Sequence, residues 1–208
     1  MAELRFFTGT MDSGKSTLAM QMAYNLAHNG RHGLLLTAHD RSGPARITSR
    51  IGLSSPALEV TPELDLLRLV ERDAARGAGP RWLVCDEAQF YTPAQIDQLA
   101  HIVDDLGVDV YAFGITTDFR ASLFPGSERL VELADRVEVL QLETLCWCGA
   151  RGTHNARVVN GAMVMDGPQV ALGDTYDDGG NSNDDDDDEV RYVVLCRRHH
   201  MRRQVARD

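Results

Sequence analysis

The sequence predicts an α/β protein, a parallel sheet with helices on both faces, to which a small β-rich subdomain is appended. Strand-like and helix-like segments alternate through residues 4–142, which is typical of a parallel sheet covered on both faces. Residues 9–16, GTMDSGKS, fit the phosphate-loop pattern G-x-x-x-x-G-K-[ST]. After residue 143, short alternating runs are framed by cysteine and histidine pairs. We therefore expect a P-loop NTPase-like nucleotide-binding domain, 1–143, and a zinc-binding β subdomain, 144–208.

Apolar runs and their stop signals define the first elements. LRFF (4–7) and GLLLTA (33–38) are typical of short buried strands. Between them, apolar residues recur at helical spacing over 17–28, and Gly30 follows as a stop signal. The polar and irregular stretch 39–50 predicts a loop.

Two Thr-Pro pairs indicate the starts of further helices, because threonine caps a helix well and proline suits its first position. The pair at 61–62 predicts a helix that ends before Gly77, and the pair at 92–93 predicts one that ends before Gly107. The other expected elements are strands over 81–85, 109–114 and 137–142 and a short helix over 127–134.

The part after residue 143 predicts hairpins. The segment NARVVNGAMVMDGPQVAL contains three short alternating runs joined by Asn-Gly and Asp-Gly, which are hairpin turn pairs. A subdomain this small buries little apolar area, so we expect a metal to hold it together.

Charge says little about partners once one segment is set aside. The formal net charge is −10, and residues 177–189 hold eight acids and no base, so the remainder of the chain carries −2. We expect the acidic run 184–189 to be a solvated excursion. The six arginines of residues 190–208 are interpreted as a solvated face, and no nucleic-acid partner is expected. No apolar run is long enough to span a membrane, and no signal peptide is recognisable, so we expect a cytoplasmic protein.

The phosphate loop contains Lys15, the only lysine among 21 basic residues. Glycines let backbone N–H groups close around phosphate, and the following helix adds its positive N-terminus. A compact ammonium fits between the β- and γ-phosphates, where the wide guanidinium fork of arginine does not. Ser16 can contact Mg²⁺. The residues expected to bind ATP phosphates are Gly9, Thr10, Met11, Asp12, Ser13, Gly14, Lys15, Ser16 and Thr17.

Two acids, Asp86 and Glu87, directly follow the strand WLVC. Ligands of open parallel sheets bind at the carboxyl edge of the strands, where both acids are expected. Asp86 is placed to hold Mg²⁺ through water, and Glu87, pointing the other way, could take a proton from an attacking hydroxyl or orient a water. The plainer interpretation is that the two acids cap the following turn.

Three cysteines and a histidine frame the β-rich part. Cys146-x-Cys148 and Cys196-x-x-His199 offer three thiolates and an imidazole, a set suited to closed, structural Zn²⁺. Because the C-x-C spacing is tight, His154 or His200 could replace one ligand. Cys85 lies in a predicted buried strand and is interpreted as packing.

Taken together, GTMDSGKST, DEAQF, TTDFRASLFPGSERL, CWCG and YVVLCRRHH, in this order, resemble the thymidine kinases of the cellular, tetrameric, zinc-containing type. The resemblance covers nearly the whole chain. It implies transfer of the ATP γ-phosphoryl group to the 5′-hydroxyl of thymidine, with deoxyuridine as a second substrate and Mg²⁺ accompanying ATP. It also implies a homotetramer and feedback inhibition by thymidine triphosphate (dTTP).

The resemblance assigns Glu87 as the catalytic base. It places Phe119 as the ring that stacks on thymine, and Tyr192 in the loop that closes over the base. It matches Met11 and Ile115 to apolar contacts near the thymine methyl group. Without the resemblance, a single phenylalanine on a loop is more often packing.

The chain departs from the family pattern in two places. Thr10 stands where the family usually has proline, and the base-enclosing loop is long and acidic, so its backbone contacts within 166–176 are left open. Two other classes of protein fit the sequence less well. A helicase-like ATPase, suggested by DEAQ, would need a second motor domain and more basic surface. A zinc-ribbon nucleic-acid module would need exposed aromatics between its basic residues.

Overall fold

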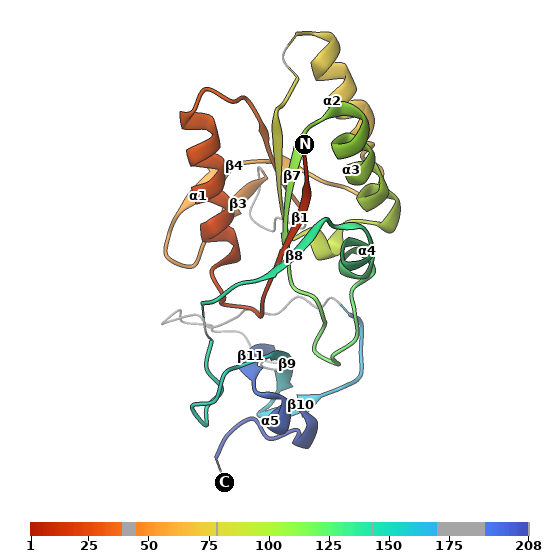
Figure 1. The fold of residues 1–208 in the computed structure, drawn as a ribbon. Coiled ribbons are helices and arrows are strands. Elements are labelled where there is room, and N and C mark those ends of the chain that lie inside the picture. Colours follow the sequence, from red (N-terminus) through yellow and green to blue (C-terminus); the bar gives the residue numbers. More distant parts are fainter. Residues whose placement is uncertain (39–44, 78, 143, 170–189, 208) are drawn as a thin grey trace, which may run out of the picture. The chain divides into compact units, whose positions relative to one another are not determined.

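The computed structural model describes residues 1–38, 45–77, 79–142, 144–169 and 190–207 (Figure 1). They form two compact units, which we treat separately. The first unit is Met1–Thr116 with Phe124–Gln141, and the second is Thr117–Leu123 with Leu142–Asp208. Within the described residues, no helix has the length and apolar character needed to cross a membrane.

A six-stranded sheet organises the first unit, in the order β5-β2-β6-β7-β1-β8. Every neighbouring pair in this sheet is parallel. The strands are β1 (Leu4–Thr8), β2 (Leu34–Thr37), β5 (Leu58–Glu59), β6 (Trp82–Asp86), β7 (Asp109–Gly114) and β8 (Arg136–Val139). The predicted parallel sheet is therefore confirmed.

Helices cover both faces of this sheet, as the sequence predicts. Figure 1 shows α1 on one face and α2, α3 and α4 on the other. Their bounds are α1 Lys15–His28, α2 Leu66–Ala75, α3 Pro93–Leu106 and α4 Pro125–Leu133, and a 3₁₀ turn, η1, spans Ala88–Phe90.

Side chains at alternating positions along the strands contribute to two separate hydrophobic cores. Successive strand side chains point to opposite faces, so Trp82 and Val84 of β6 belong to the α1 core, whereas Leu83 and Cys85 belong to the α2–α4 core. The strand is buried along its whole length, which explains its continuous apolar sequence.

Two expectations about the first unit are wrong. The helix expected from the pair at 61–62 begins at Leu66, with the Asp65 side chain accepting from the Arg68 amide at 3.0 Å. The Thr61 carbonyl instead accepts from the Gln95 side chain of α3 at 2.8 Å.

The stretch 39–50 was expected to be a loop throughout. Residues 39–44 lie outside the described part, but Arg46–Thr48 form β3, which pairs antiparallel with β4 (Ser54–Pro56). Neither strand is long enough to show a hydrophobic period, so sequence pattern could not find the pair.

The second unit is a three-stranded antiparallel sheet, β10-β9-β11, followed by a short helix. Its elements are β9 (His154–Val159), β10 (Ala162–Val164), β11 (Val190–Leu195) and α5 (Arg197–Arg202). The Asn160-Gly161 turn has positive φ at both residues, as a tight hairpin requires, so that predicted hairpin is confirmed. The run expected after Asp166-Gly167 lies largely outside the described residues, as does the acidic run 184–189.

Candidate phosphate-binding and metal sites

The phosphate loop connects β1 to α1 at the carboxyl end of the sheet. Gly14 caps the helix in a left-handed conformation, with φ 75° and ψ 19°. A Cβ atom at residue 9 would lie 2.4 Å from the Ser13 hydroxyl oxygen, so a larger residue there would displace the Ser13 side chain. The Ser13 hydroxyl in turn donates to the Thr10 carbonyl at 2.8 Å. The predicted loop residues thus form a tight curl at the N-terminus of a 14-residue helix, which is the arrangement that binds phosphate.

Lys15 lies inside this curl and is only 8% exposed. Its ammonium donates to the Thr10 carbonyl at 2.7 Å. Burial lowers the pKa of Lys15, while the nearby charges of Glu87 and Asp86 act to raise it. The single lysine is therefore a buried point charge held by the loop it would serve, with both candidate acids within electrostatic reach.

Asp86 ends β6 and is 3% exposed. Burial and the neighbouring Glu87 charge raise the pKa of Asp86 to about 7, although hydrogen bonds from the Ser16 side chain and the Glu87 backbone, and the Lys15 charge, oppose the rise. Asp86 and Ser16, the two residues predicted to accompany Mg²⁺, are therefore in direct contact.

The raised pKa of Asp86 makes stability depend on pH. The folded state holds this proton above the usual aspartate pKa of about 3.9, so Asp86 stabilises the fold below about pH 4 and loses that contribution as the pH rises towards about 7. In chemical denaturation without nucleotide, we expect Asp86→Asn to be progressively stabilised relative to the wild type between these pH values. A wild-type and Asp86→Asn difference that does not change with pH would contradict the raised pKa.

Glu87 follows in a left-handed conformation, φ 51° and ψ 35°, which is uncommon for a residue with a side chain. Its carboxylate accepts from the Gln89 amide at 2.5 Å, and the Gln89 carbonyl oxygen accepts from the Ile115 backbone at 3.2 Å. Gly114 is required here, since a Cβ would lie 2.6 Å from that oxygen. The carboxylate after β6 is thus fixed to the end of β7, where Ile115 lies.

Two residues near this carboxylate were not predicted from sequence. Gln89 is almost fully buried, and its only sequence signal is a polar residue inside the motif DEAQF. Arg50, next to β3, forms an ion pair with Asp12 of the phosphate loop. Burial lowers the pKa of Arg50 and the Glu87 charge opposes this, so Arg50 is also close to the carboxylates. No pattern marked Arg50 among twenty arginines.

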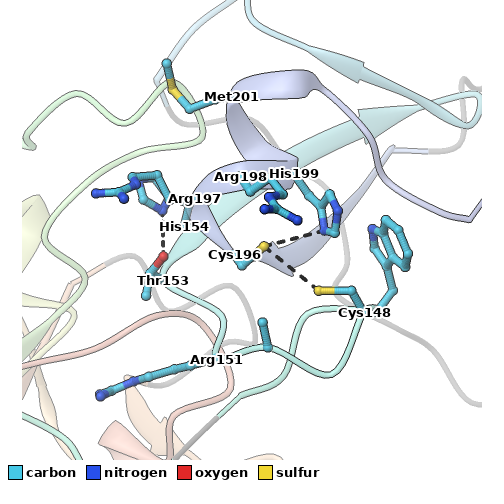
Figure 2. Close-up of a pocket in the computed structure, with 11 residues that line it drawn as sticks. Cys148, Arg151, Thr153, His154, Cys196, Arg197, Arg198, His199 and Met201 are labelled. Carbon is cyan, nitrogen blue, oxygen red and sulfur yellow. Dashed lines mark hydrogen bonds between the residues drawn. The ribbon is translucent and has the colours of Figure 1, made fainter.

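The second unit brings together Cys146, Cys148, Cys196 and His199, whose candidate ligand atoms all lie within 4.8 Å of one another. The His199 Nδ1 atom is 3.3 Å from the Cys146 sulfur and 3.4 Å from the Cys196 sulfur. The Cys148 and Cys196 sulfurs are 4.0 Å apart, and Figure 2 shows these side chains directed toward one another. Tetrahedral zinc separates such atoms by roughly 3.5–3.8 Å, so the donor set and its spacing fit structural zinc.

The surroundings of these four residues also suit a metal site. Backbone N–H groups of His199 and Arg198 hydrogen bond to the Cys196 sulfur and lower the pKa of its thiol, which favours the thiolate that binds metal. The Trp147 ring stacks on His199 at 4.1 Å between centroids and fixes its orientation. His154 and His200, the alternative ligands, are not part of this group.

Phe119 and Tyr192 both belong to the second unit. Phe119 is 2% exposed, and its carbonyl accepts from the buried His200 ring at 2.9 Å. The Tyr192 hydroxyl accepts from Arg157 at 3.0 Å, a residue that no sequence motif marked. The two aromatic residues that the family resemblance assigns to the base are therefore held by contacts within one unit.

Comparisons with known proteins agree with the resemblance. The family model "Thymidine kinase" matches residues 2–200. A thymidine kinase of Streptomyces coelicolor is 59% identical over 174 residues, covering 84% of this chain and 81% of the relative. A thymidine kinase of Cutibacterium acnes is also 59% identical, with the same coverage. One from Rhizobium meliloti is 43% identical over 179 residues, covering 83% of this chain and 90% of the relative.

Similarity to solved structures is weaker. A structure titled for DNA unwinding by Pif1 helicases matches 66% of this chain and 39% of the helicase chain, at 18% identity and a TM-score of 0.35, which is too low to support an argument. The family model and the relatives, by contrast, extend over most of the chain at high identity. The chain therefore belongs to the thymidine kinase family of enzymes.

Proposed function

We propose that this chain transfers the γ-phosphoryl group of ATP to the 5′-hydroxyl of thymidine, yielding dTMP and ADP, and accepts deoxyuridine as a second substrate. The observation that supports the proposal most is that Lys15 lies within electrostatic reach of both Asp86 and Glu87 at the carboxyl edge of the sheet. Phosphoryl transfer to a hydroxyl needs a phosphate-binding ammonium next to one carboxylate for the metal and a second carboxylate for the hydroxyl.

Each residue has a role in this proposal. The phosphate loop binds the ATP phosphates through its backbone, and Lys15 stabilises the charge on the transferred group. Ser16 and Asp86 would hold Mg²⁺, which supplies additional positive charge at the phosphates. Glu87 acts as general base for the thymidine 5′-hydroxyl, with Gln89 fixing the carboxylate. For the base, the resemblance points to Met11, Ile115, Phe119 and Tyr192.

We also propose a domain organisation and a metabolic role for the chain. We assign the nucleotide-binding domain to residues 1–143 and the zinc-binding subdomain, with the base-enclosing loop and the acidic insertion, to residues 144–208. Within the first range, Thr117–Leu123 belong to the compact second unit. The enzyme serves pyrimidine salvage and the supply of DNA precursors, without a nucleic-acid or membrane partner. From the family we also infer a homotetramer and inhibition by dTTP, which sedimentation and inhibition assays would test.

ATP consumption measured with and without nucleoside tests the proposed function. We expect ADP formation to depend on thymidine or deoxyuridine and to be unaffected by single-stranded DNA. ATP hydrolysis that needs no nucleoside and rises with DNA would instead support a helicase-like ATPase.

Cys148→Ser is expected to release zinc and to loosen the second unit. Removing one thiolate from a structural site costs metal affinity, and the small core around Cys146 and Leu195 has few apolar contacts to replace it. We expect metal analysis to fall from one zinc per chain to well below one, and hydrogen exchange to accelerate in β9 and β11 but not in β6 and β7. Cys85→Ala, outside the cluster, should retain its zinc. A Cys148→Ser protein with a full zinc content would indicate that His154 or His200 is a ligand.

A further inference from the structure

Arg157 is a buried cation in the middle of β9, and only 3% of it is exposed. Its Nε atom donates to the Tyr192 hydroxyl at 3.0 Å, and its Nη2 atom donates to the Pro168 carbonyl at 3.0 Å. Its guanidinium carbon lies 3.8 Å from the centre of the Phe119 ring. One side chain therefore joins three segments of the second unit that are distant in sequence.

The sheet register fixes this position. Arg157 on β9 pairs directly with Tyr192 on β11, so the two side chains share one face of the sheet. The Phe119 ring lies under the guanidinium plane, in a close cation–π contact. The guanidinium carbon of Arg120 also lies near Phe119, but it is 5.2 Å from the ring centre and Arg120 is paired with Asp118. Its contact with the ring is therefore weaker than that of Arg157.

Burying this charge is costly for a purely structural residue. Among the described residues, Arg157 forms no ion pair with an acid, and the oxygen atoms that accept its hydrogen bonds are neutral. An apolar side chain of similar size usually stabilises such a position as well or better. The buried arginine is therefore better explained by a functional role, in which its planar set of donors holds neighbouring side chains in a fixed orientation.

We propose that Arg157 is a positioning residue that orients Phe119 and Tyr192 for the pyrimidine base, an inference that rests on the proposed function. A guanidinium has only donors, so the Tyr192 oxygen accepts from it and the hydroxyl proton is left to donate elsewhere. A carbonyl oxygen of a pyrimidine is a suitable acceptor. The guanidinium lies against the Phe119 ring and so holds the plane of that ring.

Steady-state kinetics of Arg157→Gln and Arg157→Lys test this role. Both variants lose the fork that holds the Tyr192 hydroxyl, so we expect the KM for thymidine to rise about tenfold or more, the scale of a lost hydrogen bond to a charged group. The kcat should stay within a few-fold, and the KM for ATP and the zinc content should not change. Arg151→Gln, an exposed arginine of the same unit, is the matched control and should resemble the wild type.

A double-mutant cycle separates positioning from general damage. If Arg157 acts through Tyr192, the Arg157→Gln effect on the thymidine KM should shrink in a Tyr192→Phe background. Effects of the two changes that simply multiply, unaltered kinetics in both Arg157 variants, or loss of zinc and folding in both, would each overturn the inference. Failure of the proposed function looks different, because the wild type itself would then consume ATP without thymidine.

Discussion

Replacing Lys15 with arginine should lower kcat/KM for thymidine phosphorylation by about 100-fold or more, the scale of removing one preorganised group that stabilises the transferred charge. The ammonium lies within the phosphate loop, 2.7 Å from the Thr10 carbonyl and almost fully buried. A guanidinium keeps the charge but is wider and planar, so it cannot occupy the same position between the phosphates. Steady-state kinetics with ATP and thymidine would measure the loss.

Two controls separate the effect of side-chain shape at residue 15 from general effects of a lysine–arginine exchange and from unfolding. Arg68→Lys, the reverse exchange at an exposed site on α2, should leave turnover unchanged. Circular dichroism and thermal unfolding should show that the Lys15→Arg protein retains its sheet. Near-normal turnover of Lys15→Arg would mean that charge alone suffices in the loop, and that the lone lysine has another explanation.

Glu87→Gln should lower kcat by about 100-fold or more, as expected for the loss of a general base, with little change in thymidine affinity. The amide keeps the size of the carboxylate and lacks its negative charge and its capacity to accept the hydroxyl proton. Single-turnover kinetics would report the chemical step, and calorimetric titration with thymidine would report binding. Glu71→Gln, exposed on α2, is the matched control.

The division between rate and affinity decides what Glu87 does. If thymidine binding collapses while the remaining turnover is nearly normal, Glu87 is a binding residue and the base lies elsewhere. The contact with Gln89 adds a second check, because an amide at residue 87 can still form a hydrogen bond with it. The unit should therefore remain folded in this variant.

Local signals predicted the fold where neighbouring residues reinforced them. At the start of α3, Thr92 caps the helix and Gln95, three residues later, completes a capping box, so both the start and the type of element are confirmed. The pair at 61–62 has Leu64 at the corresponding position, which cannot return the hydrogen bond, and the helix begins four residues after Pro62. The sequence therefore distinguishes the two Thr-Pro pairs by the residue three positions after the threonine, which is Gln95 in one case and Leu64 in the other.

In the candidate site, too, the residues that were predicted are those with a recognisable spacing in the sequence. The glycines and Lys15 of the phosphate loop are adjacent in sequence, so their spacing alone indicated the curl that the structure shows. The cysteine and histidine pairs are far apart, but the strict demands of a metal on its ligands made them recognisable, and the structure brings them together. The roles assigned to the individual residues remain predictions.

Residues that act through tertiary contacts left no such signal. Gln89 is defined by its bonds to Glu87 and Ile115, and Arg157 by a cross-strand partner and a ring from another segment. Neither the identity nor the spacing of these residues differs from that of ordinary polar residues in their elements. Only the register of β9 with β11 and the approach of β7 to η1 distinguish them.

The composition of the second unit has a consequence for how the chain acquires its shape during synthesis. The sheet of the first unit has all its strands once β8 has left the ribosome, and domains generally fold as they emerge. The segment Thr117–Leu123 is by then already made, yet its partners in the second unit include Arg157 of β9 and His200 of α5. The Phe119 ring must therefore remain without these contacts until β9 and then α5 have been synthesised. During that interval, an aromatic side chain that is buried in the folded protein is exposed to solvent, and the folding of the second unit ends that exposure.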